Sequence, residues 1–448
     1  MANIIIAINK RNGIGLNNSL PWGCKEDLKM FKELTLNKTL IIDRKTLENL
    51  PFLEHRKIIC MTNKVPKEKK NNNYKNNDVC FVNNIDPNIL TENVFIAGGK
   101  EIYEYFLTEH KRRIKKIYLS EIDNETECDT YFDKSLLLEN YIITKETSFD
   151  TFKHFVIEPG TTGEEQYLNM ARKILNQGEY RDTRSGKTQS IFHNNLTFDL
   201  RKGFPLLTTK KMFLRGIIEE FIFFINGETN SNLLSEKKVR IWEGNTSEEF
   251  IKNKGLPYSK GIMGPMYGYQ WRFFNAPYDI DVNGVPFKSK GGIDQFQNVL
   301  NLIKNDPKSR RILMTAYNPS QAEQGVLYPC HSIVIQFYVQ NEYLDMFCYN
   351  RSQDVGLGVP FNIASSSLLL MLVAKLTNKK PRFFHMTMGD THIYDDHIEP
   401  LKTQINRIPY SLPKITLSDD IDMDHLKVSD FVLSEYKSYN RIEMSMSS

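Results

Sequence analysis

The sequence LYPCH at residues 327–331, followed by the apolar run 332–339, is the stretch around which the second half of this chain is organised. Pro329 fixes the approach of the cysteine, and the β-branched run after it predicts a buried strand. A thiol at the mouth of a strand can act as a nucleophile where nearby cations favour its thiolate. Such cations stand on both sides, in the sequence Ser-Arg-Arg at 309–311 and at Arg351. For the motif alone, a packed core thiol is the more common interpretation.

Length and composition predict two or three globular domains, since 448 residues are enough for more than one core. A net charge of +4 is too small and too evenly spread to indicate a nucleic-acid or membrane surface. The six cysteines form no C-x-x-C pair and have no metal-like spacing with histidine, which predicts a reducing compartment and no metal site. The N-terminal residues lack signal-peptide features, and the apolar run 368–374 is too short to span a bilayer, so we expect a cytoplasmic protein.

Short apolar strands alternate with helices along the first half. The expected strands are 3–8, 39–42, 57–61 and 93–97, with closing strands in 112–122 and 141–157, and the expected helices are 25–34 and 100–107. This alternation predicts an α/β domain.

Asp27 shares one face of the first helix with Phe31 and Leu34, at i, i+4 and i+7. A carboxylate on an apolar face needs partners or changes its pKa, and it would suit a ring with paired N–H donors. The alternative is an acidic residue that only favours the helix N-terminus. Two further places could bind phosphate at the start of a helix. One is Arg44 with a hydroxyl nearby, and the other is Gly98-Gly99, although most such glycine pairs are turns.

Six separated motifs of the first half, taken together, resemble dihydrofolate reductase. They are Gly13-Ile14-Gly15, Leu20-Pro21-Trp22, Asp27 with Phe31, Arg44-x-Thr46, Ile96-Ala97-Gly98-Gly99 and Asp129-Thr130-Tyr131-Phe132. The resemblance covers residues 1–158 and implies a mixed sheet flanked by helices, with hydride transfer from NADPH to dihydrofolate. It implies that Asp27 binds the pterin ring and supports its protonation, and that Phe31 and Arg56 hold the folate tail. The residues it implies for NADPH are Ala7, Ile14, Gly15, Arg44, Lys45, Thr46, Thr62, Gly98 and Gly99.

One departure from that family concerns the cofactor. Asp43 stands where relatives usually have glycine, so a carboxylate lies where cofactor phosphate is expected to approach. We therefore expect a working reductase with weakened NADPH affinity. Leu47 stands where relatives carry tryptophan, a change of packing.

Residues 159–165 are the predicted linker, and 166–448 the second domain. Pro159 and Gly160 mark the boundary, and Thr162-x-x-Glu165 predicts a capping box that opens a helix. So short a connection limits the relative motion of the two halves.

In the second half, Glu220 lies in the strongly apolar helix predicted over 216–226. A buried carboxylate has a raised pKa, which would suit proton transfer. Asn362 could cap the helix expected over 363–376, or it could pair with a donor and an acceptor on a base edge. Strand alternation places Asn350, Ser352 and Asp354 on one face, and His392 with Tyr394 on another face that suits a sugar hydroxyl. The aromatic residues around Trp242 and Tyr267 are interpreted first as core.

About 285 residues of this half resemble thymidylate synthase. The matching segments include Arg184-Ser185-Gly186, Phe204 to Lys210, Asp306 to Arg311, Pro329-Cys330-His331, Arg351-Ser352-x-Asp354, Gly358-x-Pro360-Phe361-Asn362 and Gly389-Asp390-Thr391-His392-x-Tyr394. The resemblance implies an α+β domain in which Cys330 adds to C6 of dUMP and 5,10-methylenetetrahydrofolate supplies the methylene. It implies that Glu220 organises proton transfers, with Tyr267 and His331 in support, and that Trp242 and Asp354 face the folate. The implied dUMP ligands are Arg184, Asn350, Arg351, Ser352, Asp354, Asn362, His392 and Tyr394, with Arg310 and Arg311 from the second subunit of a homodimer.

This half also departs from its family in three places. Asn350 replaces the usual glutamine, and Gln336 lies five positions after His331 instead of four, which predicts a bulge in that strand. The chain also ends in serine where relatives end in an apolar residue, so we expect weaker closure by the tail.

Together the two halves imply one chain that makes dTMP and then reduces the dihydrofolate product. Two alternatives stay open at this point. The first half could be a degenerate, structural module, and the second could be a deoxypyrimidine hydroxymethylase, although Asn362 argues against a cytosine substrate.

Overall fold

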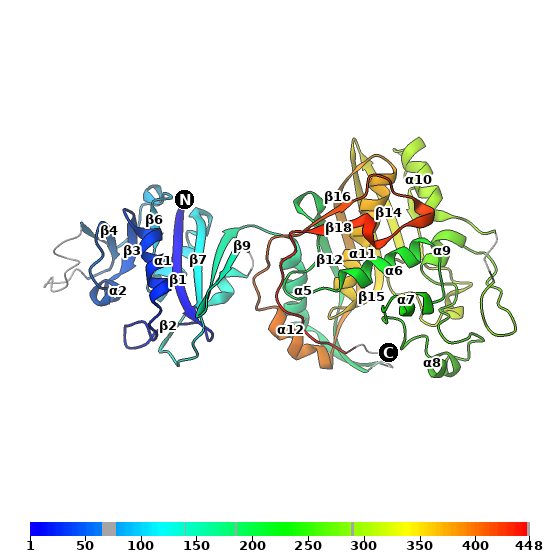
Figure 1. Cartoon of the computed structure of the whole chain (residues 1–448), viewed down its shortest axis with the longest axis horizontal. Coiled ribbons are helices and arrows are strands. Elements are labelled where there is room, and N and C mark those ends of the chain that lie inside the picture. Colours follow the sequence, from blue (N-terminus) through cyan, green and yellow to red (C-terminus); the bar gives the residue numbers. More distant parts are fainter. Residues whose placement is uncertain (65–77, 139, 184–185, 288–290, 446–448) are drawn as a thin grey trace. The chain divides into compact units, whose positions relative to one another are not determined.

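The computed structural model describes residues 1–64, 78–138, 140–183, 186–287 and 291–445. The chain divides into two compact units, each with its own sheet (Figure 1). The first unit is Met1–Thr161 together with Ile408–Ser411, and the second is Thr162–Arg407 together with Leu412–Ser448. The segment 408–411 joins the first unit because Ile143 donates its N–H to Pro409 O (2.8 Å) and accepts from Ser411 N (3.1 Å).

Among the described residues, the first unit contains an eight-stranded sheet in the order β5-β4-β3-β6-β1-β7-β10-β9. Its strands are β1 (Ala2–Asn9), β3 (Thr39–Asp43), β4 (Lys57–Met61), β5 (Val79–Val82), β6 (Val94–Ile96), β7 (Ile114–Ile122), β9 (Tyr141–Ser148) and β10 (Phe152–Pro159). Neighbouring strands are parallel from β5 to β7 and antiparallel from β7 to β9. Strand β1 is buried along almost its whole length, as a central parallel strand requires.

The α-helices in the described part of this unit are α1 (Lys25–Thr35), α2 (Arg44–Asn49) and α4 (Lys100–Thr108). A small ladder joins β2 (Gly13–Gly15) to β8 (Thr130–Tyr131). Strands β3 and β6 are parallel neighbours, and α2 and α4 follow them. Their N-termini therefore meet at one edge of the sheet, which is where ligands bind in open α/β sheets.

Within the described ranges, the second unit has a six-stranded sheet in the order β11-β12-β16-β15-β14-β13. Its strands are β11 (Glu179–Thr183), β12 (Gly186–Asp199), β13 (Leu313–Met314), β14 (Val334–Gln340), β15 (Tyr343–Asp354) and β16 (Lys380–Tyr394), and β17 (Lys414–Leu417) pairs separately with β18 (Phe431–Ser434). Its helices are α5 (Glu164–Gln177), α6 (Leu214–Ile225), α7 (Asn232–Glu236), α8 (Glu248–Asn253), α9 (Gly268–Phe273), α10 (Gln295–Asn305), α11 (Gly358–Leu376) and α12 (Ile398–Gln404). The predicted classes, α/β for the first half and α+β for the second, are confirmed.

Helix α11 begins at Gly358, five residues before the predicted start, so Asn362 lies inside the helix and the interpretation of Asn362 as its cap is wrong. The helix begins early because the Asp354 carboxylate accepts hydrogen bonds from the N–H groups of Gly356 and Gly358. In the described part of the chain, α11 is the one helix long and apolar enough to cross a membrane, yet 67% of its apolar window is buried inside the protein. It is the core helix of the second unit, packed between β15, β16 and α6.

The strand after the cysteine differs from the prediction in two ways. It begins at Val334, and only one of its faces is buried, since Gln336 and Tyr338 are exposed. Strand β14 keeps one register against β15 from Val334 to Gln340, so the predicted bulge does not lie within the strand, and the irregularity is found just before it. Ile333 donates to Tyr349 O, and the next bond of this pairing runs from Arg351 N to the carbonyl of Cys330. A regular ladder would use residue 331, so one extra residue is accommodated before β14.

Candidate active sites

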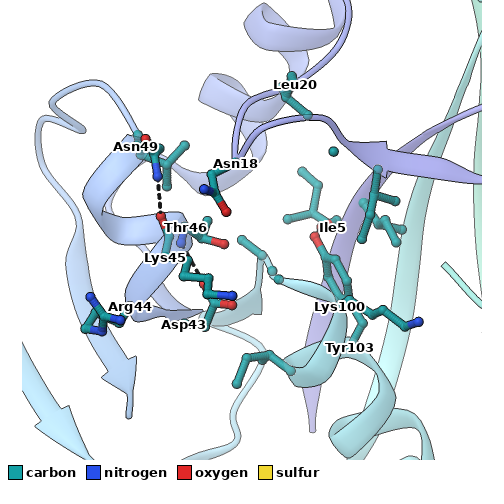
Figure 2. Close-up of a pocket in the computed structure, with 18 of the residues that line it drawn as sticks. Ile5, Asn18, Leu20, Asp43, Arg44, Lys45, Thr46, Asn49, Lys100 and Tyr103 are labelled. Atoms are coloured by element: carbon teal, nitrogen blue, oxygen red, sulfur yellow. Dashed lines mark hydrogen bonds between the residues drawn. The ribbon is translucent and has the colours of Figure 1, made fainter. Parts of the chain in front are cut away.

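The first unit holds a cavity of about 1370 Å³ at the sheet edge where α2 and α4 begin (Figure 2). The residues that line it include every residue predicted to bind in this half, namely Ala7, Ile14, Gly15, Asp27, Phe31, Arg44, Lys45, Thr46, Arg56, Thr62, Gly98 and Gly99. They come from four elements, β1, β2, α1 and α2, and from loops next to other strands, and the fold brings them to one place. The cavity is large enough for two ligands of nucleotide size.

Asp27 lies half-buried on α1 at the apolar side of this cavity. Burial raises the pKa of its carboxyl group, and a hydrogen bond from Ser120 on β7 opposes that rise. Sequence reasoning did not find Ser120, because a serine in an apolar strand carries no signal of its own. Ser120 is itself buried and lies 3.2 Å from His154 Nδ1 on the neighbouring strand β10.

Asp43 ends β3 and caps α2, where its Oδ1 accepts from Thr46 N at 2.6 Å. The same carboxylate faces the start of α4, since a Cβ placed on Gly99 would lie 2.8 Å from Asp43 Oδ2. Figure 2 shows Asp43 and Thr46 on one side of the cavity, and Lys100 and Tyr103 on the other. Glycine is therefore required at position 99 by close approach, and the Asp43 charge lies at the mouth of both helices.

The two side chains predicted for the folate tail are held in different ways, one by apolar packing and the other by hydrogen bonds. Phe31 packs on the cluster of Ile5, Leu40 and Phe95. Arg56 is only 5% exposed, and its guanidinium donates to Thr35 Oγ1, Glu54 O and Lys32 O. These bonds fix its plane beside the cavity and leave two of its five N–H groups for a ligand.

In the second unit, Cys330 lies against Tyr267 and His331. The Tyr267 hydroxyl is 3.2 Å from Cys330 Sγ, and the Cys330 N–H donates to the same oxygen at 3.4 Å. The His331 ring stacks on Tyr267 with centroids 4.1 Å apart. Burial lowers the pKa of His331 to about 4, so the imidazole is neutral near pH 7, and burial raises the pKa of Tyr267, so its hydroxyl keeps its proton and can donate to the sulfur.

The pKa of the Cys330 thiol is set by opposing influences. Burial raises it most, whereas the hydrogen bond from Tyr267 and the charge of Arg351 both lower it. The cation on the β15 side therefore favours the thiolate, as the sequence suggested, but burial outweighs it. A proton acceptor is needed to take the thiol proton before the thiolate can attack.

Glu220 lies on α6, and burial raises the pKa of its carboxyl group to about 7. The indole N–H of Trp242 donates to Glu220 Oε1 at 2.8 Å and holds that pKa down against burial. Trp242 and Tyr267 also contact each other, with ring centroids 6.0 Å apart, so Glu220 and Cys330 approach one aromatic cluster. The neighbouring Glu219 is different, because it is paired with Lys237 at 2.8 Å.

Arg351, Ser352, His392 and Tyr394 lie near the ends of β15 and β16, and Asn362 lies in the first turns of α11. The Nδ2 group of Asn362 donates to Gln353 Oε1 at 2.8 Å, which orients the Asn362 amide. His392 and Tyr394 contact each other edge to face, and His392 Nδ1 lies 2.7 Å from Asp390 Oδ1. Arg351, Arg310 and Arg311 are exposed, Ser352 is half-buried, and Arg184 lies outside the described residues.

Two of the residues predicted to bind ligands, Asp354 and Asn350, already form hydrogen bonds within the protein. Asp354 accepts from the N–H groups that open α11, and His397 Nδ1 lies 3.3 Å from its Oδ1, which helps to lower the Asp354 pKa. Asn350 is 1% exposed, and its Oδ1 accepts from Ser332 N at 2.8 Å. Sequence alternation placed both on the correct strand but could not give these partners.

Comparison with known protein families matches both units. The model of the dihydrofolate reductase family matches residues 1–156, and that of the thymidylate synthase family matches residues 165–448. Proteins named bifunctional dihydrofolate reductase-thymidylate synthase match along almost the whole chain. The one from Paramecium tetraurelia is 37% identical over 99% of this chain and 98% of its own length. Those from Arabidopsis thaliana (the second of its two) and Zea mays are each 34% identical over 99% of this chain, covering 88% and 96% of their own lengths.

The fold and the two sites thus define a reductase unit joined to a methyltransferase unit, both acting on folates. The chain belongs to the bifunctional dihydrofolate reductase–thymidylate synthases. It is therefore an enzyme with both activities, and nothing in these matches favours a degenerate first half.

Proposed function

We propose that Cys330 is the nucleophile that adds to C6 of dUMP, and that Asp27 is the acid group of dihydrofolate reduction. The observation that carries the first proposal is the joint contact of Tyr267 with the thiol and with the aromatic cluster that holds Glu220. The second is supported by the raised pKa of a half-buried carboxyl group beside a large cavity.

In the methylation step, Tyr267 holds the sulfur and the neutral His331 supports the ring of Tyr267. Addition of the thiolate to C6 makes C5 of the pyrimidine nucleophilic toward the methylene of 5,10-methylenetetrahydrofolate. Glu220, with its pKa of about 7, can take and return protons at neutral pH. The oriented amide of Asn362 reads the uracil edge, and Arg351 and Ser352, with Arg184, bind the phosphate.

In the reduction step, Asp27 binds the pterin ring and holds the proton that the ring receives, with Ser120 orienting the carboxylate. Phe31 and Arg56 bind the rest of the folate. NADPH, when bound, supplies the hydride. Arg44, Lys45, Thr46 and the backbone N–H groups at the start of α4 would bind its phosphates, next to the Asp43 carboxylate that lies beside Gly99.

We also propose that the enzyme is a homodimer through the open face of the second-unit sheet. Leu313, Gln336 and Phe347 are register partners on adjacent strands, and all three are exposed. Two of them, Leu313 and Phe347, are large apolar side chains, and exposed apolar side chains on one face of a sheet are typical of a surface that another subunit covers. Arg310 and Arg311, next to this face, would then complete the phosphate site of the partner.

One experiment tests the two chemical assignments together. The purified protein receives dUMP, methylenetetrahydrofolate and NADPH, and dTMP and tetrahydrofolate are followed in time. Cys330→Ser should abolish dTMP formation and leave NADPH-dependent reduction of added dihydrofolate unchanged, whereas Asp27→Asn should do the reverse. Loss of both activities in either variant would contradict two separate sites, and dTMP formation by Cys330→Ser would remove the proposed nucleophile.

A further inference from the structure

The thiol of Cys330 sits on a short segment, residues 330–332, that is held at both ends by strand β15. At one end, the Cys330 carbonyl accepts from the N–H groups of Arg351 (2.8 Å) and Ser352 (3.2 Å). At the other end, Ser332 adopts a left-handed conformation with φ of +55°. A positive φ is energetically unfavourable for serine, so surrounding contacts must hold Ser332 in this conformation.

Asn350 supplies the contact at that second end. Its Oδ1 accepts the Ser332 N–H at 2.8 Å, and the Cys348 thiol donates to the same oxygen at 3.4 Å. The side chain is 1% exposed, and Ser332 is 5% exposed. Among the described residues, the Nδ2 group of Asn350 has no hydrogen-bond partner, so the oxygen is the part of the amide that the fold uses.

We infer that Asn350 is a positioning residue for the nucleophile and not a ligand of the nucleotide. Asn350 fixes the extra residue before β14, and through that residue it fixes Cys330. The inference rests on the proposed role of Cys330. A ligand would need an open side chain that faces the substrate, whereas the Asn350 oxygen is occupied by a backbone amide in the interior.

The physical consequence of losing the Asn350 oxygen follows from burial. The Ser332 N–H would remain buried without an acceptor, and the left-handed turn would relax to recover one. Cys330 lies two residues away and would move with it, relative to the fixed ring of Tyr267. A misplacement on the order of 1 Å in a reacting group costs about 100-fold in rate.

The test compares three variants of the full-length enzyme. Asn350→Leu removes the oxygen and keeps the branching and number of side-chain heavy atoms, Asn350→Asp keeps an acceptor oxygen and so serves as the rescue, and Asn194→Leu is the control. Asn194 is a buried asparagine of the same sheet whose Nδ2 likewise lacks a partner among the described residues. For each variant we would measure kcat for dTMP formation, the Kd of dUMP alone, and the rate at which iodoacetamide alkylates Cys330, identified by peptide mass.

We expect Asn350→Leu to lower kcat by roughly 10- to 100-fold and to change the alkylation rate at least threefold, while the Kd of dUMP stays within about threefold. Asn350→Asp should keep kcat within about fivefold, and Asn194→Leu should resemble the unmodified enzyme. A large rise in the Kd of dUMP with an unchanged alkylation rate would make Asn350 a ligand and overturn the inference, as would equal losses in Asn350→Leu and Asn194→Leu. If Cys330→Ser itself kept activity, the proposed nucleophile would fail instead, so the two failures are distinguishable.

Discussion

The hydrogen bond from Trp242 to Glu220 makes a quantitative prediction about the pH dependence of dTMP formation. Trp242→Phe keeps an aromatic ring and removes the indole N–H that donates to Glu220 Oε1 at 2.8 Å. That bond stabilises the ionised carboxylate, and burial destabilises it, which together place the pKa of Glu220 at about 7. Without the donor, burial acts alone and the pKa must rise.

The size of the rise follows from the strength of the bond. A hydrogen bond to a charged group contributes about 1.5–3 kcal/mol, and one pKa unit corresponds to about 1.4 kcal/mol. The pKa of Glu220 should therefore rise by about one to two units. The acidic limb of the kcat profile should move upward by the same amount, because Glu220 must be ionised to accept a proton.

The assay is dTMP formation at saturating substrates between pH 5.5 and 9.5, and the chain offers a matched control. Trp271 also packs on Phe224, as Trp242 does, but its indole nitrogen has no hydrogen-bond partner among the described residues. Trp271→Phe should lower stability or rate without moving the limb. The reasoning is refuted if Trp242→Phe leaves the limb in place, or if both variants move it equally.

Three further predictions concern the reductase unit. Asp43→Asn keeps the oxygen that accepts from Thr46 N and removes the charge, so the KM for NADPH should fall several-fold. Asp43→Ala should in addition lose the helix cap and about 1 kcal/mol of unfolding free energy. An unchanged KM for NADPH in Asp43→Asn would contradict interference by the Asp43 charge. Ser120→Ala should raise the apparent pKa of dihydrofolate reduction by about one unit, because Asp27 loses a donor to its ionised form, and a static pH profile would count against that contact. Burial lowers the pKa of His154 to about 4, so between pH 6.5 and pH 4 the unfolded chain binds a proton that the folded one does not, and stability falls as the pH falls. His154→Phe should remove roughly 2 kcal/mol of the loss of unfolding free energy between pH 7.5 and pH 5, measured by urea denaturation at both pH values; an equal pH dependence in both proteins would contradict the assignment.

The sequence by itself determined the classes of both folds and the composition of both sites. Alternating apolar segments predicted the α/β unit, and helix and strand bounds such as 57–61 agreed because they depend on local periodicity and turn residues. Residues predicted from separated motifs, such as Asp27, Arg44 and Gly98, line one cavity because strand order and helix starts bring them to one sheet edge. The extra residue between His331 and Gln336, relative to the resembled family, predicted an irregularity that the structure places just before β14.

Only the tertiary structure decided which partner each polar side chain takes. The bond from Asn350 to Ser332 and that from Trp242 to Glu220 join residues 18 and 22 positions apart, and no local pattern ranks such pairs. Burial also decides the direction of the Cys330 pKa shift, because the loss of solvation outweighs the nearby guanidinium of Arg351, which favours the thiolate. Sequence therefore names the chemical groups of this enzyme, whereas register and burial assign their pKa values and their partners.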